Sequence, residues 1–339
     1  MKLIRIPSKE TISVEEAPKP EVEAGSVLLS IKYVGFCGSD LNTFLGRNLM
    51  AKDAVIPGHE IGAVIEEVGN NVPDFLKPGM TVTVNPYTNC GHCAACRSGH
   101  VNACEHNETL GVQRDGAMRE YILLPWEKVI PAKGLTPLQC ALVEPMSVGF
   151  HAISRAEVTD IDTVMVLGCG MIGVGAIVRA SLRGATVIAV DLDDEKLSLA
   201  KTLGAKYVIN SKTENLYERL QEITAGFGPS VVVEAVGSVP TYQAAIEEVG
   251  FTGRVVCIGY SKNDVSFHTK LFVQKELNIR GSRNAMPSDF EAVINYLIKG
   301  QCPTEKLISC IVKPESAIEA MQNWCADPGK VFRILVDFN

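Results

Sequence analysis

The chain has 339 residues, of which 46% are hydrophobic and 21% are charged, and this composition excludes a disordered chain and a coiled coil. At about 100–200 residues per domain, the length favours two domains. The 32 Lys and Arg residues against 39 Asp and Glu residues give a net charge of −7, and no basic tract is present, so nucleic acid is not an expected partner.

The chain opens on Met1–Arg5 without the apolar core of a secretion signal, and no stretch approaches the roughly 20 apolar residues of a membrane span. The eleven cysteines are an odd number, which argues against a disulfide framework and for a reducing compartment. We therefore expect a cytoplasmic protein without membrane contact, and we expect metal binding by some of the cysteines.

The first 125 residues or so consist of short β-like runs separated by turn residues. Examples are Val27–Tyr33, Gly62–Val68 and Met80–Val84, the last directly after Pro78-Gly79. This pattern predicts an all-β region with long loops.

Candidate ligands of a catalytic metal are spread over this region. Cys37 is followed 22 residues later by His59, Glu60 comes next, and Glu144 stands just before Pro145. Cys, His and carboxylate groups all bind zinc, and three protein ligands with an open fourth position suit a catalytic site. A Cys and a His this far apart are also common packing residues, so the residue types alone leave both interpretations open.

A polar loop carries four cysteines in the pattern C-x2-C-x2-C-x7-C. Four thiolates at this spacing can surround Zn²⁺ tetrahedrally. A ferredoxin cluster is disfavoured, because the fourth cysteine would follow after three residues and be followed by Pro. We predict a structural zinc here, and we interpret the nearby His92, His100 and His106 as solvated loop residues. The four ligands are Cys90, Cys93, Cys96 and Cys104.

After Glu144 the pattern changes to continuous apolar runs, spaced by 21 to 24 residues, with room for one helix between neighbours. Such runs are typical of strands that are covered on both faces, and the repeat predicts a parallel, doubly wound sheet. We place this domain at residues 146–282. The runs begin near Val164, Thr186, Tyr207, Val231, Val255 and Leu277.

A glycine-rich loop joins the first of these runs to a predicted helix over Val174–Arg183. The motif is G-x-G-x-x-G, in which the first glycine makes the turn, the second admits a pyrophosphate and the third packs the helix on the strand. We expect this loop to bind a dinucleotide. The predicted contacts are Gly168, Gly170, Met171, Ile172 and Gly173.

The second run ends at Asp191, 23 residues after Gly168, close to the position of the acid that binds the adenosine ribose. A carboxylate there repels a 2′-phosphate, and Leu192–Asp194 contains no Arg to receive one. We therefore predict NAD rather than NADP.

The last part of the chain begins with a predicted helix over Phe290–Ile298, with Ser288 and Asp289 as N-cap residues. Val331–Phe338 is predicted to be a closing strand that returns to the first domain. The first domain would then comprise residues 1–145 and 283–339.

These motifs, in this order, resemble the zinc-containing medium-chain alcohol dehydrogenases over essentially the whole chain. Within that family the chain is similar to the sorbitol, threonine and sugar-acid dehydrogenase branch. Gly281–Ala285 followed by Asp289-Phe290 resembles bacterial enzymes that oxidise L-galactonate or L-idonate. The resemblance implies a GroES-like β-rich catalytic domain, a Rossmann domain, two Zn²⁺ per chain and a homodimer or homotetramer.

The resemblance also implies roles for single residues. Cys37, His59 and Glu60 would bind the catalytic zinc, with Glu144 as a further ligand, directly or through water. Asp40 would accept a hydrogen bond from the His59 ring, and Ser39 would pass on the substrate proton. The polyol branch usually has His where this chain has Asn42, so the end of the proton relay would be ribose hydroxyl and water. Arg333 would reach the cofactor pyrophosphate. For a substrate carboxylate the candidates are Arg283 with its neighbour Asn284, and also Arg114 and Arg47.

The implied activity is hydride transfer from a secondary alcohol of a sugar acid or polyol to NAD. The alternatives within enzymes are a polyol, a polyol phosphate or L-threonine as substrate at the same zinc. A cofactor-binding regulatory protein of dehydrogenase ancestry is the alternative from another class. A zinc-free quinone reductase is disfavoured, because it would lack both the cysteine loop and the catalytic ligands.

Overall fold

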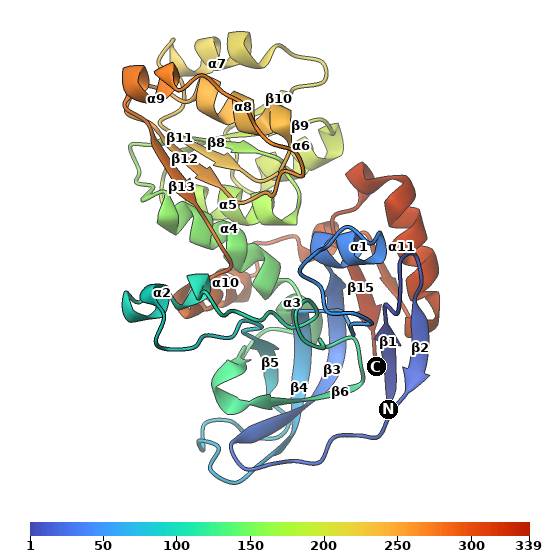
Figure 1. The fold of residues 1–339 in the computed structure, drawn as a ribbon. Helices are drawn as coiled ribbons and strands as arrows, with labels where there is room; N and C mark the ends of the chain where they lie inside the picture. Colours follow the sequence, from blue (N-terminus) through green and yellow to red (C-terminus); the bar gives the residue numbers. More distant parts are fainter. The chain divides into compact units, whose positions relative to one another are not determined.

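The computed structural model describes all 339 residues, which divide into two compact units. The first unit comprises Met1–Glu144 and Met286–Asn339, and the second comprises Pro145–Ala285. Both ends of the chain therefore belong to the first unit (Figure 1).

A seven-stranded sheet forms the frame of the first unit. Its order is β14-β15-β3-β4-β5-β7, and β6 also pairs with β3. Neighbouring strands are antiparallel except β14 and β15, which are parallel. The strands are β3 (Ser26–Phe36), β4 (Glu60–Val68), β5 (Thr81–Val84), β6 (Tyr121–Pro125), β7 (Val129–Pro131), β14 (Cys310–Val312) and β15 (Ile334–Asp337); β1 (Lys2–Arg5) and β2 (Ser13–Glu16) form a separate pair.

The first unit also contains helices, so the prediction of an all-β region up to residue 125 is wrong in part. Cys37 begins α1 as its N-cap, and its N–H donates to Asp40 Oδ2 over 2.8 Å, a local bond that favours the helical turn. The helices are α1 (Gly38–Phe44), α2 (Ala94–Arg97), α3 (Pro137–Cys140), α10 (Pro287–Ile298) and α11 (Ala317–Ala326), with 3₁₀ turns at Val101–Ala103, Trp126–Lys128, Thr304–Leu307, Pro314–Ser316 and Pro328–Lys330.

Helix α10 is found where the sequence predicts a helix, but it begins earlier. Its N-cap is Met286, and Pro287 occupies the first helical position. Asp289 lies in the first turn and accepts a hydrogen bond from the Met286 N–H over 3.0 Å. The prediction of Ser288 and Asp289 as N-cap residues is therefore wrong, because a proline is well suited to start the helix.

The second unit is a six-stranded, all-parallel sheet in the order β10-β9-β8-β11-β12-β13. Each strand matches one of the six predicted runs, and a helix lies between each consecutive pair, so the predicted doubly wound sheet is confirmed. The strands are β8 (Thr163–Leu167), β9 (Thr186–Asp191), β10 (Tyr207–Asn210), β11 (Val231–Glu234), β12 (Arg254–Cys257) and β13 (Asn278–Gly281); the helices are α5 (Met171–Leu182), α6 (Asp194–Thr202), α7 (Leu216–Thr224), α8 (Val239–Glu248) and α9 (Lys270–Lys275). Helix α4 (Val143–Arg155) begins in the first unit and continues into the second.

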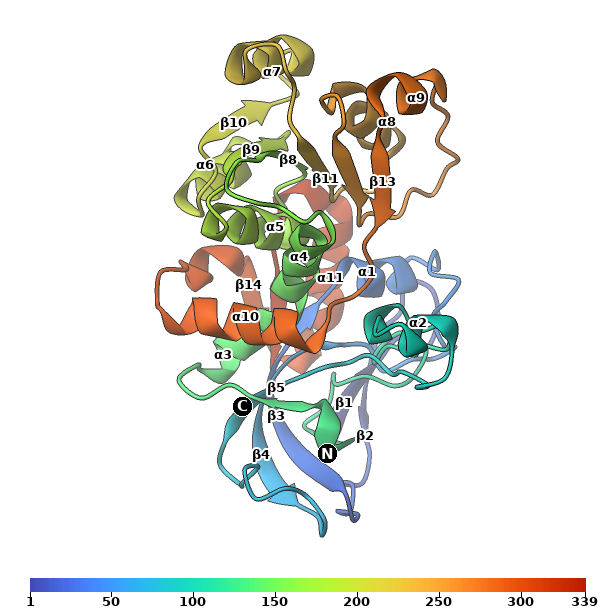
Figure 2. The same cartoon turned by 90° about the vertical axis from the view of Figure 1, so that its left-hand side faces the viewer.

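Both faces of this parallel sheet are buried. Met165 and Leu167 of β8 belong to a buried cluster with Leu220 of α7 and Ala245 of α8. On the other face, α5 approaches β8 closely at Gly173 and Val166. Figures 1 and 2 show α5 and α8 on opposite faces of the sheet, which explains why its strands are continuous apolar runs. None of the helices is both long enough and apolar enough to cross a membrane.

Helix α3 lies against β4 at Gly62. A methyl group at this position would stand 1.7 Å from the carbonyl oxygen of Pro137, in the first turn of α3. Because that oxygen belongs to the backbone, the helix would have to move to accept a side chain.

We expect Gly62→Ala to lower the free energy of unfolding by about 2–3 kcal/mol, the cost of overpacking a fixed site. Urea denaturation measures the loss. Gly281→Ala is the matched control, because a methyl there meets no atom within 4 Å. Equal stability of the two variants would contradict the tight contact.

Candidate functional site

A cluster of three metal-binding side chains occupies the first unit, with His59 and Glu60 buried and Cys37 half-buried. The ligand atoms of Cys37, His59 and Glu60 all lie within 4.8 Å of one another. Cys37 follows β3, His59 precedes β4 and Glu60 begins it, and the register pairs Gly35 with Glu60. The antiparallel pairing of two adjacent strands therefore brings together ligands that are 22 residues apart.

The cluster depends on a glycine at position 35. A methyl group there would lie 2.1 Å from Glu60 Oε2. A side chain at position 35 would therefore displace the Glu60 carboxylate from its place against β3.

The three ligands influence each other's ionisation. Burial by itself raises the pKa of the Cys37 thiol, but the hydrogen bond with His59 and the nearby positive charges outweigh it and bring that pKa down to about 7. Burial lowers the pKa of His59, and the bond and charge of Cys37 reverse this and raise it well above its usual value. Burial raises the pKa of Glu60 well above its usual range, although Arg333 acts against it. These shifts favour a thiolate at position 37, the form that binds a metal.

The buried polar atoms of the cluster have few partners within the chain. Glu60 is fully buried, and neither of its carboxylate oxygens accepts a hydrogen bond; His59 Nδ1 is likewise unpartnered. Buried polar atoms without partners carry a large desolvation cost. A sulfur, a nitrogen and an oxygen ligand suit Zn²⁺, so the residues present fit a zinc ion.

Arg333 supplies the positive charge beside Glu60, and the sequence analysis did not foresee this contact. Its guanidinium is buried, with Nη1 3.0 Å from Glu60 Oε1, and it donates to the Phe36 carbonyl oxygen over 2.7 Å. No motif signals this pair, because 273 residues separate its members (333 − 60). The assignment of Arg333 to a cofactor pyrophosphate stays a prediction.

Glu144 lies in the first turn of α4 and is buried. Its Oε1 accepts a hydrogen bond from the Tyr87 hydroxyl, and burial together with this carboxylate raises the pKa of Tyr87 well above its usual value. Glu144 stands outside the group of three, but its charge acts on both His59 and Glu60. Tyr87 is a further site residue that sequence reasoning missed, because an isolated tyrosine carries no motif.

The proposed relay residues lie on α1. Ser39 Oγ is buried without a hydrogen-bond partner, and Asn42 Nδ2 donates to the Gly38 carbonyl oxygen over 2.9 Å. The predicted hydrogen bond from the His59 ring to Asp40 is not formed. Asp40 Oδ2 is occupied by the Cys37 N–H, while Asp40 Oδ1 and His59 Nδ1 have no partner. Asp40 therefore acts on His59 through its charge.

The four-cysteine loop forms a second cluster in the first unit, with all four sulfur atoms within 4.8 Å of one another. Backbone N–H groups of Cys90 and Cys93 point at the sulfur atoms of Cys104 and Cys90, each over 3.3 Å. Backbone hydrogen bonds lower the pKa of Cys93 to about 6. Donors directed at sulfur stabilise a thiolate at Cys93, whereas burial raises the pKa of Cys96 to about 11. Because a bound metal deprotonates its thiol ligands, four convergent cysteine sulfurs fit a closed tetrahedral zinc shell. Cys96 completes the set together with those three.

The glycine loop lies in the second unit between β8 and α5. Gly168 has a φ of +94°, and a methyl at Gly173 would lie 1.9 Å from the Gly168 carbonyl oxygen. At Gly170, the N-cap of α5, a methyl would meet nothing within 4 Å. Two glycines are thus required by the fold itself, and Gly170 leaves open space at the helix N-terminus, where a pyrophosphate fits. Met171 and Ile172 are the first two residues of α5.

Asp191 ends β9 and is held beside this loop. Its Oδ2 accepts from the Cys169 N–H over 2.6 Å, and its Oδ1 accepts from the Leu192 and Asp193 N–H groups over 2.7 and 3.1 Å. The carboxylate is therefore fixed next to the glycine turn.

The predicted substrate residues Arg283 and Asn284 follow β13 near the end of the second unit, and both are half-buried. Arg47 is exposed, and Arg114 donates to the Pro86 carbonyl oxygen over 3.4 Å in the first unit. Their assignment to a substrate carboxylate stays a prediction.

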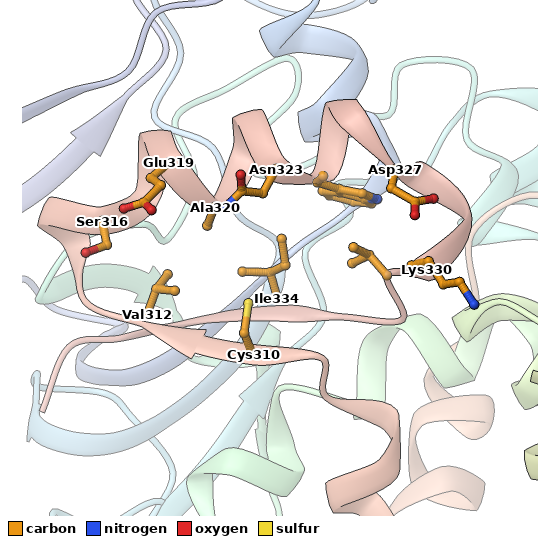
Figure 3. Close-up of a pocket in the computed structure, with 11 residues that line it drawn as sticks. Cys310, Val312, Ser316, Glu319, Ala320, Asn323, Asp327, Lys330 and Ile334 are labelled. Atoms are coloured by element: carbon orange, nitrogen blue, oxygen red, sulfur yellow. The ribbon is translucent and has the colours of Figure 1, made fainter. Parts of the chain in front are cut away.

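A separate pocket of about 430 Å³ lies between β14, β15 and α11 (Figure 3). Apolar groups such as Val312 and Ile334 face it together with Cys310. None of the predicted catalytic, metal-binding or cofactor-binding residues lines it.

Two family models match the chain. The alcohol dehydrogenase GroES-like domain matches residues 23–134, and the zinc-binding dehydrogenase domain matches residues 172–299. The chain is 32% identical to a sorbitol dehydrogenase of Halalkalibacterium halodurans over 302 residues, 88% of each chain. It is 32% identical to the L-galactonate-5-dehydrogenase of Escherichia coli over 282 residues, 83% of each chain. A solved structure of an alcohol dehydrogenase (rspB) from Escherichia coli CFT073, complexed with NADH, aligns with a TM-score of 0.91, 30% identity and 99% coverage of both chains.

Zinc content tests the two clusters. We expect the protein to hold two zinc ions per chain, and we expect Cys37→Ala to hold one, because it removes a ligand of one cluster only. Elemental analysis after dialysis against a weak chelator measures this. Cys310→Ser, an exposed cysteine outside both clusters, should keep both ions. Two ions in Cys37→Ala would contradict the assignment.

A double-mutant cycle tests the buried pair of Arg333 and Glu60. Arg333→Met leaves a buried carboxylate without its counter-charge and should lower the free energy of unfolding by about 3–5 kcal/mol. Adding Glu60→Gln should restore about 1–3 kcal/mol of this loss. Urea denaturation at one fixed free zinc concentration gives the four values, and strictly additive costs would show that the pair does not interact.

Proposed function

This chain belongs to the zinc-containing medium-chain alcohol dehydrogenases, in the branch that includes sorbitol and sugar-acid dehydrogenases, and on that basis we propose that it oxidises a secondary alcohol of a sugar acid or polyol with NAD. The observation that carries the proposal is the convergence of Cys37, His59 and Glu60. Their sulfur, nitrogen and oxygen ligands are suited to a catalytic zinc, and the buried Glu60 Oε2 has no partner within the chain.

In this proposal, Cys37, His59 and Glu60 hold the catalytic zinc, and Cys90, Cys93, Cys96 and Cys104 hold a second, structural zinc. When bound, the catalytic ion supplies a Lewis acid for the alcohol and NAD supplies the hydride acceptor. Arg333 compensates the charge of Glu60 in the dry interior, which keeps the carboxylate available as a ligand. Tyr87 orients Glu144, which completes the ligand set directly or through water.

The substrate proton leaves through Ser39. Its hydroxyl is buried, has no partner within the chain and stands two residues from Cys37. Asn42 cannot take over the proton, because an amide does not titrate and its Nδ2 is bonded to Gly38. We assign the rest of the relay to a ribose hydroxyl of the cofactor and water.

NAD is the proposed cofactor. The open space at Gly170 accommodates the pyrophosphate, and Asp191, fixed beside the glycine turn, accepts from the adenosine ribose hydroxyls. A 2′-phosphate would meet this carboxylate, and Leu192–Asp194 offers no Arg to neutralise it. Related solved structures contain NADH in one case and NADP in another, so the choice of NAD rests on Asp191. Arg333 is proposed to reach the pyrophosphate as well.

The proposed substrate is a sugar acid like L-galactonate, on the basis of the 32% identity to the L-galactonate-5-dehydrogenase. Arg283 would bind the carboxylate, and Asn284 would bind a hydroxyl. A polyol is the second candidate, because the sorbitol dehydrogenase relative is equally similar at 32% identity. We further propose that the protein is cytoplasmic, in keeping with its eleven free cysteines. A homodimer or homotetramer is proposed from the family resemblance alone.

Oxidation of a panel of sugar acids, polyols, polyol phosphates and L-threonine, followed by NADH absorbance, tests the function. We expect zinc-dependent turnover of one sugar acid, faster with NAD than with NADP, and none in Cys37→Ala. Ser39→Ala should lower kcat by about 100-fold, the usual contribution of a positioned proton-transfer group. Thr43→Val, on the same helix, should retain most of the rate.

Turnover of a polyol alone would select the second candidate. If protein that contains two zinc ions and binds NAD turned over no substrate of the panel, the substrate assignment would be overturned. If it turned over none and held a single zinc ion per chain, the regulatory protein would be favoured instead.

A further inference from the structure

Two exposed histidines lie next to the four-cysteine loop and have no part in the proposed reaction. Cys90 Sγ, a ring nitrogen of His92 and a ring nitrogen of His106 all lie within 4.8 Å of one another. The two imidazole rings lie side by side, with centroids 6.0 Å apart and planes inclined by 30°. The interpretation of these histidines as separate solvated residues accounts for their exposure but not for this convergence.

The orientation of His92 favours metal binding. Its Nδ1 lies 2.8 Å from the Cys90 carbonyl oxygen. A carbonyl oxygen can only accept, so Nδ1 must carry the proton and donate. Nε2 then holds the free lone pair. A backbone carbonyl that fixes the tautomer in this way is the usual support of a metal-binding histidine.

The third histidine of the loop shows that this arrangement is not general. His100 Nδ1 pairs with the Ser98 hydroxyl at 3.2 Å, and His100 is not part of the group. His100 is equally exposed and lies between the other two in sequence, so it provides a matched control.

We propose that Cys90, His92 and His106 form an outer zinc site that shares the Cys90 thiolate with the four-cysteine site. Two imidazoles and a thiolate suit a borderline divalent cation such as Zn²⁺, and water would complete the tetrahedron. Zinc–ligand distances of about 2.0–2.3 Å require ligand atoms roughly 3.5 Å apart, so a small rotation of two exposed rings is sufficient. A thiolate has lone pairs for two metals, so Cys90 can serve both sites.

The outer site differs in its chemistry from both inner clusters. His92 and His106 are exposed, whereas Cys93 and Cys104 of the four-cysteine site are buried. With one shared thiolate and open positions toward water, the outer ion exchanges readily. Helix α2, which begins directly after Cys93 of this loop, lies away from the strands of the sheet in Figure 1.

Equilibrium dialysis of the zinc-loaded full-length protein tests the proposal. We expect one equivalent of Zn²⁺ beyond the content that survives a weak chelator. This equivalent should be lost in His92→Gln/His106→Gln and retained in His100→Gln. Both inner ions should remain in all three proteins, because no histidine of this loop belongs to the inner sets.

Cobalt identifies the ligands of this extra equivalent. Co²⁺ added to the zinc-loaded protein should produce a thiolate-to-cobalt charge-transfer band in the wild type and in His100→Gln. The double variant should lack it. Equal binding by wild type and double variant, or a bound cobalt without the thiolate band, would overturn the proposal. Loss of an inner ion in the double variant would also overturn it, since the histidines would then serve the four-cysteine site.

Discussion

The burial of the Glu60 carboxyl group is the constraint on which the rest of the first unit depends. A carboxylate with no exposed surface is costly unless positive charge surrounds it. Arg333 provides that charge over 3.0 Å, and the metal that Cys37, His59 and Glu60 are suited to hold would provide more. The site therefore combines buried groups of opposite charge, and the fold has to bring Glu60, Arg333 and the other ligands close together.

Strand pairing in the sheet of the first unit positions these side chains. β3 carries Gly35 opposite Glu60 on β4, and the next turn places Cys37 beside His59. On the other side of β3, β15 pairs antiparallel, with Ile334 opposite Phe36, and this register places Arg333 over the same strand end. The return of the C-terminal strand to the first sheet thus supplies the counter-ion of the site. Replacing Glu60 on β4, Gly35 on β3 or Arg333 just before β15 would disturb the same balance.

In the second unit, the main constraint is that the backbone of the glycine loop must come close to an anionic ligand. Its sheet is covered on both faces, and in such sheets ligands bind beyond the carboxyl ends of the strands. Gly168 and Gly173 are needed for the turn and for the packing of α5. Gly170 is not needed for packing, and its open space is most simply explained by a ligand. In the proposed function, the zinc ligands and the dinucleotide loop thus lie in different compact units of one chain.

Local patterns in the sequence were enough to predict the doubly wound sheet, its six strands, the glycine turn and the family. Continuous apolar runs and short motifs reflect contacts between residues that are close in the sequence, so they can be recognised without knowledge of the fold. The sequence also indicated which residue types could bind zinc. What it left open was their arrangement: the helix after Cys37, the engagement of Asp40 with the Cys37 N–H instead of His59, the support of Glu144 by Tyr87, and the pairing of Arg333 with Glu60. Two of these contacts, Tyr87 with Glu144 and Arg333 with Glu60, were decided only by the tertiary structure, because they join residues far apart in the chain through strand register and burial, and neither leaves a periodic signal. The helix after Cys37 and its bond to Asp40 are local, but a helix of seven residues is too short to show a hydrophobic period of its own.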